Sequence, residues 1–133
     1  MDEPTPLDEP RSRAAGARRA KRGRLSRSAE FERAYRQGRS HSNRHLVVYA
    51  FPRGAGEEAR LGLSVSRKVG GAVQRNRVKR LLREAYAAEE RVVPAGHDVV
   101  VVARPGAHEL AEREGLDGIR AALRELLEKA GRS

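Results

Sequence analysis

The chain has 133 residues, 38% of them hydrophobic and 35% charged, which suits one domain with a modest core. Its net charge of +10 favours a polyanionic partner, because each neutralised phosphate releases counterions. The sequence has no cysteine, which excludes disulfides and thiolate metal sites, and no apolar run approaches the ~20 residues of a membrane span. The first residues lack the apolar core of a secretory signal, so we expect a soluble cytoplasmic protein without a membrane partner.

Positive charge is concentrated in two segments of the sequence. Residues 11–44 contain twelve Arg or Lys against two acids, and residues 67–83 contain seven against none. From residue 104 onward, six basic residues are balanced by six acids. This distribution is typical of a nucleic-acid footprint, whereas the alternative, a merely soluble Arg-rich chain, does not require it.

Residues 1–23 show no apolar periodicity and run from acidic and Pro-rich to Arg- and Ala-rich. We predict a disordered tail, because this segment could not bury enough apolar surface to offset its ordering entropy. Its basic half could bind RNA without specificity, or it could be a spectator extension. Residues 24–133 are predicted to form the single folded domain.

The folded part is predicted to begin with a helix of about ten residues. Ser28 is a plausible N-cap and Gly38 a C-terminal stop. Between them, Phe31 and Tyr35 are four residues apart and therefore share one helix face.

Two strands are predicted next, at residues 44–51 and 60–66, joined by a Gly-containing turn. In the first, Val47 and Tyr49 share a face. In the second, one face is apolar and the other small and polar, so that another group can approach it closely. The small face consists of Gly62, Ser64 and Ser66. We expect the two strands to form an antiparallel hairpin.

The remaining elements alternate between helix and strand. A long helix is predicted at residues 73–90, and four consecutive valines in residues 98–103 indicate a central strand buried on both faces. Residues 107–115 could be a helical turn or a loop. An amphipathic helix is predicted at residues 116–130. The element order predicts an α+β fold with helices packed on a single sheet.

The helix at residues 75–86 has two chemically different faces. Its apolar stripe consists of Val78, Leu81, Leu82, Ala85 and Tyr86, and its opposite stripe of Asn76, Lys79, Arg80 and Arg83, with Arg75 and Arg77 at the sides. Lys79 and Arg83 are one turn apart, about 6 Å, and can meet neighbouring phosphates. Like charges at this spacing repel by tenths of a kcal/mol unless an anion lies between them. The pattern therefore predicts a helix that docks by one face and binds anions with the other.

The segment Arg75-Asn76-Arg77 lies at the predicted helix start, where free backbone N–H groups and the helix dipole also favour an anion. Arg offers a planar fork to phosphates or guanine edges. Two cations at this end oppose the dipole of a free helix, which indicates that an anion completes the site.

The sequence of residues 62–86, taken as a whole, resembles the signature of the bacterial ribonuclease P protein. It reads Gly-Leu-Ser-Val-Ser-Arg-Lys from Gly62, followed by Gly-x-Ala-Val-x-Arg-Asn-Arg-x-Lys-Arg-x-x-Arg. The similarity runs almost without a gap over residues 62–86 and extends more loosely over most of the chain. Gly71, where the family commonly has Asn, and the long N-terminal tail are departures from the pattern, and neither touches the basic face.

The resemblance implies a fold, a function and partners. The expected fold is a four-stranded mixed sheet with a left-handed βαβ crossover, helices on one side and a cleft on the other. The expected function is that of the protein subunit of a ribonucleoprotein endoribonuclease for tRNA 5′ processing. Its partners would be the ribonuclease P RNA, which carries the catalytic groups, and precursor tRNA, whose 5′ leader enters the cleft. Mg²⁺ would be held mainly by the RNA and substrate, and no DNA partner is expected.

The resemblance also assigns roles to individual residues. The leader-binding cleft would be lined by Phe31, Tyr35, Val47, Tyr49, Lys79 and Arg83. Contacts to RNA would come from Arg67, Lys68, Arg75, Asn76, Arg77, Lys79, Arg80 and Arg83. Aromatic platforms beside cations are a common device for holding a single strand. The alternative for the aromatic residues is ordinary core packing, because the chain has only five.

Other functions fit the residues less well. An autonomous nuclease needs a carboxylate cluster or a paired acid and base. Asp98 is the only Asp between residues 9 and 116, and the four histidines are scattered, so we expect no catalytic or metal-binding residue on the protein. A ribosomal protein or RNA chaperone is the serious alternative. Only the ribonuclease P interpretation predicts tighter binding to leader-bearing than to mature tRNA when the RNA subunit is present.

Overall fold

The computed structural model describes Leu25, residues 28–54 and residues 56–132. Four strands form one mixed sheet in the order β1-β2-β4-β3, in which only the β3–β4 pair is parallel. The strands are β1 (Arg39–Ser42), β2 (Leu46–Pro52), β3 (Arg60–Val65) and β4 (His97–Ala103). The predicted tail and the exact start of the domain lie outside the described residues. The predicted α+β fold with one four-stranded mixed sheet is confirmed.

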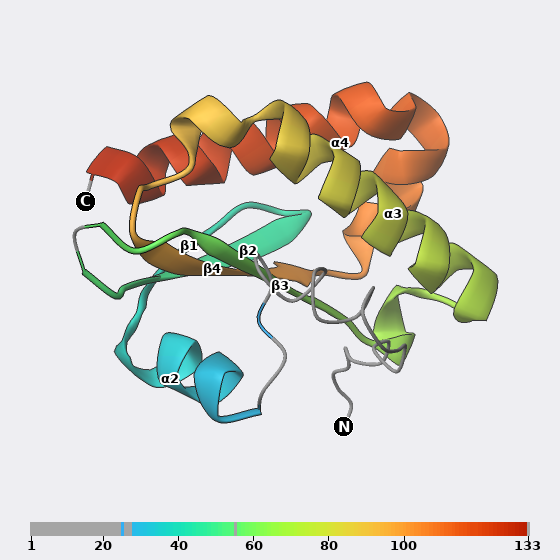
Figure 1. Cartoon of the computed structure of the whole chain (residues 1–133). Helices are drawn as coiled ribbons and strands as arrows, with labels where there is room; N and C mark the ends of the chain where they lie inside the picture. Colours follow the sequence, from blue (N-terminus) through green and yellow to red (C-terminus); the bar gives the residue numbers. More distant parts are fainter. Residues whose placement is uncertain (1–24, 26–27, 55, 133) are drawn as a thin grey trace, which may run out of the picture.

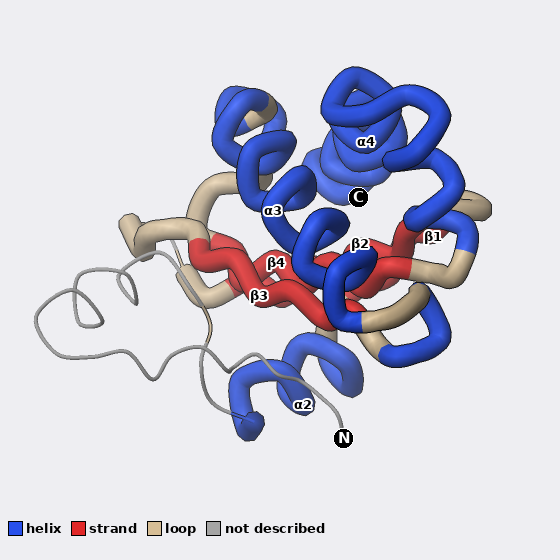
Figure 2. Tube along the Cα trace, turned by 90° about the vertical axis from the view of Figure 1, so that its right-hand side faces the viewer, coloured by secondary structure: helices blue, strands red, loops and turns tan. Residues whose placement is uncertain are grey.

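The helices are distributed over both faces of the sheet (Figures 1 and 2). One face is covered by α3 (Ala72–Ala88) and α4 (Gly106–Arg132), and the shorter α2 (Ser28–Gln37) crosses the opposite face. Two 3₁₀ turns, η3 (Arg67–Val69) and η4 (Glu90–Val92), flank α3. No helix in the described ranges is both long and apolar enough to cross a membrane.

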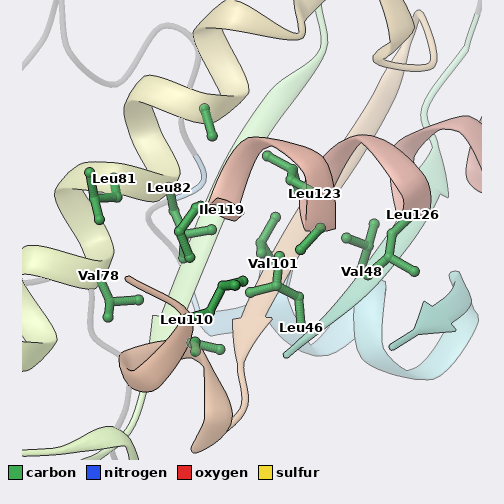
Figure 3. Close-up of a cluster of buried hydrophobic side chains, with 14 of the residues drawn as sticks. Leu46, Val48, Val78, Leu81, Leu82, Val101, Leu110, Ile119, Leu123 and Leu126 are labelled. Carbon is green, nitrogen blue, oxygen red and sulfur yellow. The ribbon is translucent and has the colours of Figure 1, made fainter. Parts of the chain in front are cut away.

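The main core lies between the sheet and the helices α3 and α4 (Figure 3). Its fully buried side chains include Leu46 and Val48 of β2, Val101 of β4 and Leu123 of α4. These positions alternate along β2 and β4, so each strand gives every second residue to this core. The strand faces that point the other way are therefore free to meet α2.

A smaller cluster fills the space under α2. Leu25, Phe31, Ala34 and Val100 are buried there, with partly buried Tyr49 beside them. Gly62 permits this close packing, because a Cβ at this position would lie 2.8 Å from the Cζ atom of Phe31. The small face predicted for the strand at residues 60–66 is thus approached by the chain's own helix.

The predicted hairpin between β2 and β3 is wrong, because β4 lies between them and pairs with both. Val99, Val100 and Val101 are all fully buried, and the central position gives this valine strand a hydrogen-bonded partner on each edge and cover on each face. The burial of the β4 valines therefore accounts for the central place of β4 in the sheet. The nearness of β2 and β3 in the sequence does not make them neighbours.

Two further elements differ from the sequence interpretation. β1 was not predicted, because the sequence Arg39–Ser42 contains no apolar residue. The turn after it is fixed by Asn43, whose side chain accepts the Leu46 N–H at 2.9 Å and donates to the Ala122 carbonyl at 3.1 Å. Residues 107–115, left open between helix and loop, are helical and merge into α4 across a kink at Gly115, where φ is 61°.

Candidate RNA-binding site

The two faces predicted for α3 are present in the structure. Val78, Leu81, Leu82 and Ala85 are buried against the sheet and α4, and Tyr86 is partly buried beside them. On the other face, Asn76 and Arg80 are exposed, while Lys79 and Arg83 are partly exposed. The helix therefore docks by its apolar stripe and presents its polar stripe outward.

The N-terminus of α3 has several features that favour binding of an anion. Gly71 is the N-cap, and it provides no side-chain hydrogen bond to the N–H groups of the first turn, which contains no acid. Arg75 lies beside this end, with its Nε 3.4 Å from the Gly71 carbonyl oxygen. The uncapped end of the helix dipole and an adjacent guanidinium both favour a negative group here.

The η3 turn adds two more cations next to this helix start. Arg67 and Lys68 are both exposed, and the backbone of the turn is held by Ser66, whose Oγ accepts the Lys68 N–H at 3.3 Å. The predicted RNA-binding residues Arg67, Lys68 and Arg75 are thus brought together at the junction of η3 and α3.

Arg77 has a different environment from the other predicted RNA-binding residues. Its Nη1 lies 3.4 Å from the Glu112 carboxylate, and its Nη2 donates to the Ala111 carbonyl at 3.3 Å. This arginine therefore attaches α3 to the first part of α4. Arg80 lies 3.9 Å from Glu84 one turn away, but both side chains are more than half exposed, so this ion pair contributes little.

The predicted aromatic cleft residues lie together on the opposite face of the sheet. The Tyr35 ring is edge-to-face with both Phe31 and Tyr49, at centroid distances of 6.3 and 4.9 Å. Phe31 is buried, whereas Tyr35 is 38% exposed. Val47 lies two residues from Tyr49 on the same face of β2 and is partly exposed. These four residues form an aromatic cluster between α2 and β2, on the face where the cleft is expected.

Lys79 and Arg83 are not part of this aromatic cluster. Both are carried by α3, which packs on the other face of the sheet against the edge strand β3. They could therefore approach the aromatic cluster only across the β3 edge.

The sequence interpretation missed an ionic network between α2 and the strands β3 and β4. Asp98 is fully buried and accepts two hydrogen bonds from Arg60, at 2.8 and 2.9 Å. Arg60 also bonds Glu30 of α2 at 3.0 Å, and Arg33 of α2 lies 3.9 Å from Asp98. The hydrogen bond to Asp98 is the main cause that raises the pKa of Arg60.

This network fastens α2 to the sheet and so positions the helix that carries Phe31 and Tyr35. Arg53 adds a further contact to Asp98 at 3.5 Å, and the Arg33 guanidinium lies 5.2 Å from the ring centroid of Phe51. One feature of the sequence could have indicated this network: Asp98 is an isolated acid at the start of a strand of valines. A carboxylate buried in such a strand requires charged or hydrogen-bonding partners.

Comparisons with known proteins agree with this architecture. The sequence matches the family Ribonuclease P over residues 20–131. The ribonuclease P protein component of Bacillus pumilus is 43% identical over 94 residues, which cover 71% of this chain and 79% of that protein. The component from Clostridium acetobutylicum is 39% identical over 112 residues, which cover 84% and 91%.

Solved structures show the same relationship. The RNase P protein of Staphylococcus aureus has a TM-score of 0.72 and 34% identity, covering 81% of this chain and 94% of that one. The RNase P protein of Thermotoga maritima has a TM-score of 0.71 and 34% identity, covering 80% and 96%. On the family match, the level of identity and the shared fold, this chain belongs to the ribonuclease P protein family.

Proposed function

We propose that this protein is the protein subunit of ribonuclease P, binds the catalytic RNA, and holds the 5′ leader of precursor tRNA during 5′ maturation. The observation that carries the proposal is the start of α3, where an uncapped helix end without acids meets Arg67, Lys68 and Arg75. Its membership of the ribonuclease P family supports an RNA as the partner of this surface.

The junction of η3 and α3 would contact the ribonuclease P RNA. Backbone N–H groups at the helix start and the arginine forks both suit phosphate oxygens. Asn76 and Arg80 are exposed one turn further along and extend the same surface. Binding to this surface is expected to be strongly salt-dependent, with a slope that reports how many phosphates are neutralised.

The aromatic cluster would bind the single-stranded leader. Tyr35 is substantially exposed beside Tyr49, so it offers a stacking surface that accepts any base. Lys79 and Arg83 lie across the β3 edge and would meet leader or RNA phosphates. The protein would thus add affinity for a substrate that still carries its leader.

The chemistry of phosphodiester cleavage is assigned to the RNA. Among the described residues, no group of three His, Asp or Glu side chains is placed to hold a metal ion. We assign the Mg²⁺ expected for this reaction mainly to the RNA and the substrate. The side chains of this protein bind and orient RNA, and none is given a catalytic role.

Reconstitution tests the proposal. The purified protein is mixed with a bacterial ribonuclease P RNA and a precursor tRNA at low Mg²⁺, and release of the 5′ leader is followed. We expect cleavage that neither component gives alone under these conditions. Tight but indiscriminate RNA binding without stimulated cleavage would instead support a ribosomal protein or RNA chaperone.

A further inference from the structure

One large hydrophobic side chain lies outside both cores of the protein. Val73, in the first turn of α3, is 80% exposed, and among the described residues the only other exposed side chain of this kind is Tyr35, at 38%. Neither of the two hydrophobic clusters in the described part of the chain includes Val73. The fold therefore gains no packing from this valine.

The helix also gains nothing from a valine at this position. A β-branched side chain loses rotamer freedom in a helix, and valine ranks below alanine, glutamate and lysine in helix propensity. Any of these three would suit an exposed position of α3 better. Single exposed apolar residues are common on protein surfaces, so the neighbours of Val73 decide whether it has a function.

Val73 shares its helix face with residues that we propose to bind RNA. Positions three, four and seven residues further along a helix lie on the same face, and here they are Asn76, Arg77 and Arg80. Asn76 is exposed, and the side chains of Arg77 and Arg80 are 39% and 62% exposed. Arg80 follows Val73 after two turns, about 10 Å along the helix axis. One apolar group thus begins a row of hydrogen-bonding and charged groups.

This mixture of groups matches the chemistry of a nucleotide. The phosphate carries the negative charge, whereas the C–H groups of the sugar and the faces of the base are apolar. Asn76 and Arg80 suit phosphate oxygens or base edges, and Val73 suits the apolar parts of the same RNA segment. A partner that offered only carboxylates would pair with the arginines and leave Val73 in water.

We propose that Val73 packs against the sugar or base face of a nucleotide in the ribonuclease P RNA, while the cations on its helix face bind the phosphates. The inference rests on the proposed function and adds an apolar contact to a surface that otherwise attracts RNA by charge. Burial of an apolar group releases no counterions, so this contact raises affinity without changing its salt dependence. The contact also depends on the shape of the RNA, whereas attraction between cations and phosphates acts on any RNA.

The test measures binding of the full chain to the ribonuclease P RNA, and to a non-cognate structured RNA of similar length, over a series of KCl concentrations. Val73→Ala should weaken binding to the ribonuclease P RNA by about 4- to 15-fold, the worth of one to two buried methyl groups. The slope of log K against log salt should stay unchanged, and binding to the non-cognate RNA should stay near its wild-type value. Val73→Ile keeps a β-branched apolar side chain and should retain the wild-type affinity.

Two controls separate this contact from charge and from folding. Arg80→Gln changes the same helix face, and loss of one phosphate contact should lower the salt slope by about 1 for both RNAs. Thermal unfolding of the free protein reports a structural role. Because Val73 is 80% exposed and alanine is the better helix former, Val73→Ala should leave Tm unchanged or slightly raised.

The inference is overturned if Val73→Ala binds the ribonuclease P RNA as tightly as the wild type, weakens binding to both RNAs equally, or lowers Tm. Unchanged RNA binding with reduced self-association in sedimentation would also overturn it, and would place a second copy of the chain on Val73. A wild-type protein that binds the two RNAs equally well would refute the proposed function itself, whatever the result for Val73→Ala.

Discussion

Replacing Arg60 with methionine should destabilise the protein far more than an ordinary surface substitution. Arg60 donates two hydrogen bonds to the fully buried Asp98 and one to Glu30, and its own side chain is only 18% exposed. Removing one partner of a buried ion pair costs about 3–5 kcal/mol, because the remaining charge loses its compensation. Arg53 and Arg33 stay within 4.0 Å of Asp98, so we expect the lower end of this range, about 3 kcal/mol.

The assay is urea denaturation of the free protein, followed by circular dichroism. A loss of about 3 kcal/mol is a large share of the roughly 5–15 kcal/mol typical of a domain, so the midpoint should shift clearly. Arg36→Met is the control, because the Arg36–Glu32 pair is 73% and 65% exposed and should contribute less than about 1 kcal/mol. Glu30→Gln keeps the Arg60–Asp98 bonds and should fall between the two.

The functional readout separates this network from the RNA-binding surface. Since the network holds α2 against the sheet, Glu30→Gln should weaken discrimination between leader-bearing and mature tRNA while binding to the RNA subunit is unchanged. The reasoning would be refuted if Arg60→Met and Arg36→Met lowered the free energy of unfolding equally. Equal loss of leader discrimination and RNA binding in Glu30→Gln would refute the positioning role.

Three further predictions concern the charges on α3 and α4. Lys79→Ala and Arg83→Ala should each raise the apparent KM for precursor tRNA, reduce the salt slope of binding by about 1, and be rescued by high Mg²⁺. Glu112→Gln should strengthen RNA binding by up to about fivefold in a filter-binding assay, because it frees Arg77 from an exposed ion pair. The pKa of Glu89 is lowered by hydrogen bonds from Arg124 and then Arg120, so its stabilisation is present above about pH 4.5 and is lost as the pH falls further. Glu89→Gln should therefore flatten the fall of Tm on the acid side.

Each of these predictions has an outcome that contradicts it. A loss of turnover in Lys79→Ala or Arg83→Ala that no Mg²⁺ concentration restores would indicate a role in chemistry. Weaker RNA binding in Glu112→Gln would show that the contact of Arg77 with α4 supports the RNA-binding surface and does not compete with it. An unchanged acid profile in Glu89→Gln would place the acid-sensitive group elsewhere.

The local elements could be read from the sequence because their causes are local. The two faces of α3 follow from helical periodicity, and Val78 and Leu82 are buried as that periodicity requires. The valine run of β4 indicated burial on both faces, which the structure confirms. The pairing of Phe31 with Tyr35 follows from their spacing of four residues on one helix.

Features that depend on distant segments could not be read in this way. β1 has no apolar residue and is a strand only because β2 supplies its partner and Asn43 fixes the turn. The central place of β4 results from competition among strands for burial, which no single segment encodes. The Asp98 network joins residues of α2, β3 and β4 that are tens of positions apart.

The measurement that tests the central claim most directly compares leader-bearing precursor tRNA with mature tRNA. Each is titrated against the ribonuclease P RNA with and without this protein, at fixed salt and Mg²⁺. We predict that the protein raises affinity for the precursor selectively, and that Tyr35→Leu removes most of this gain while leaving RNA-subunit binding intact. An equal gain for both tRNAs would contradict the account. The protein would then bind RNA non-specifically through its positive charge and would have no site for the leader.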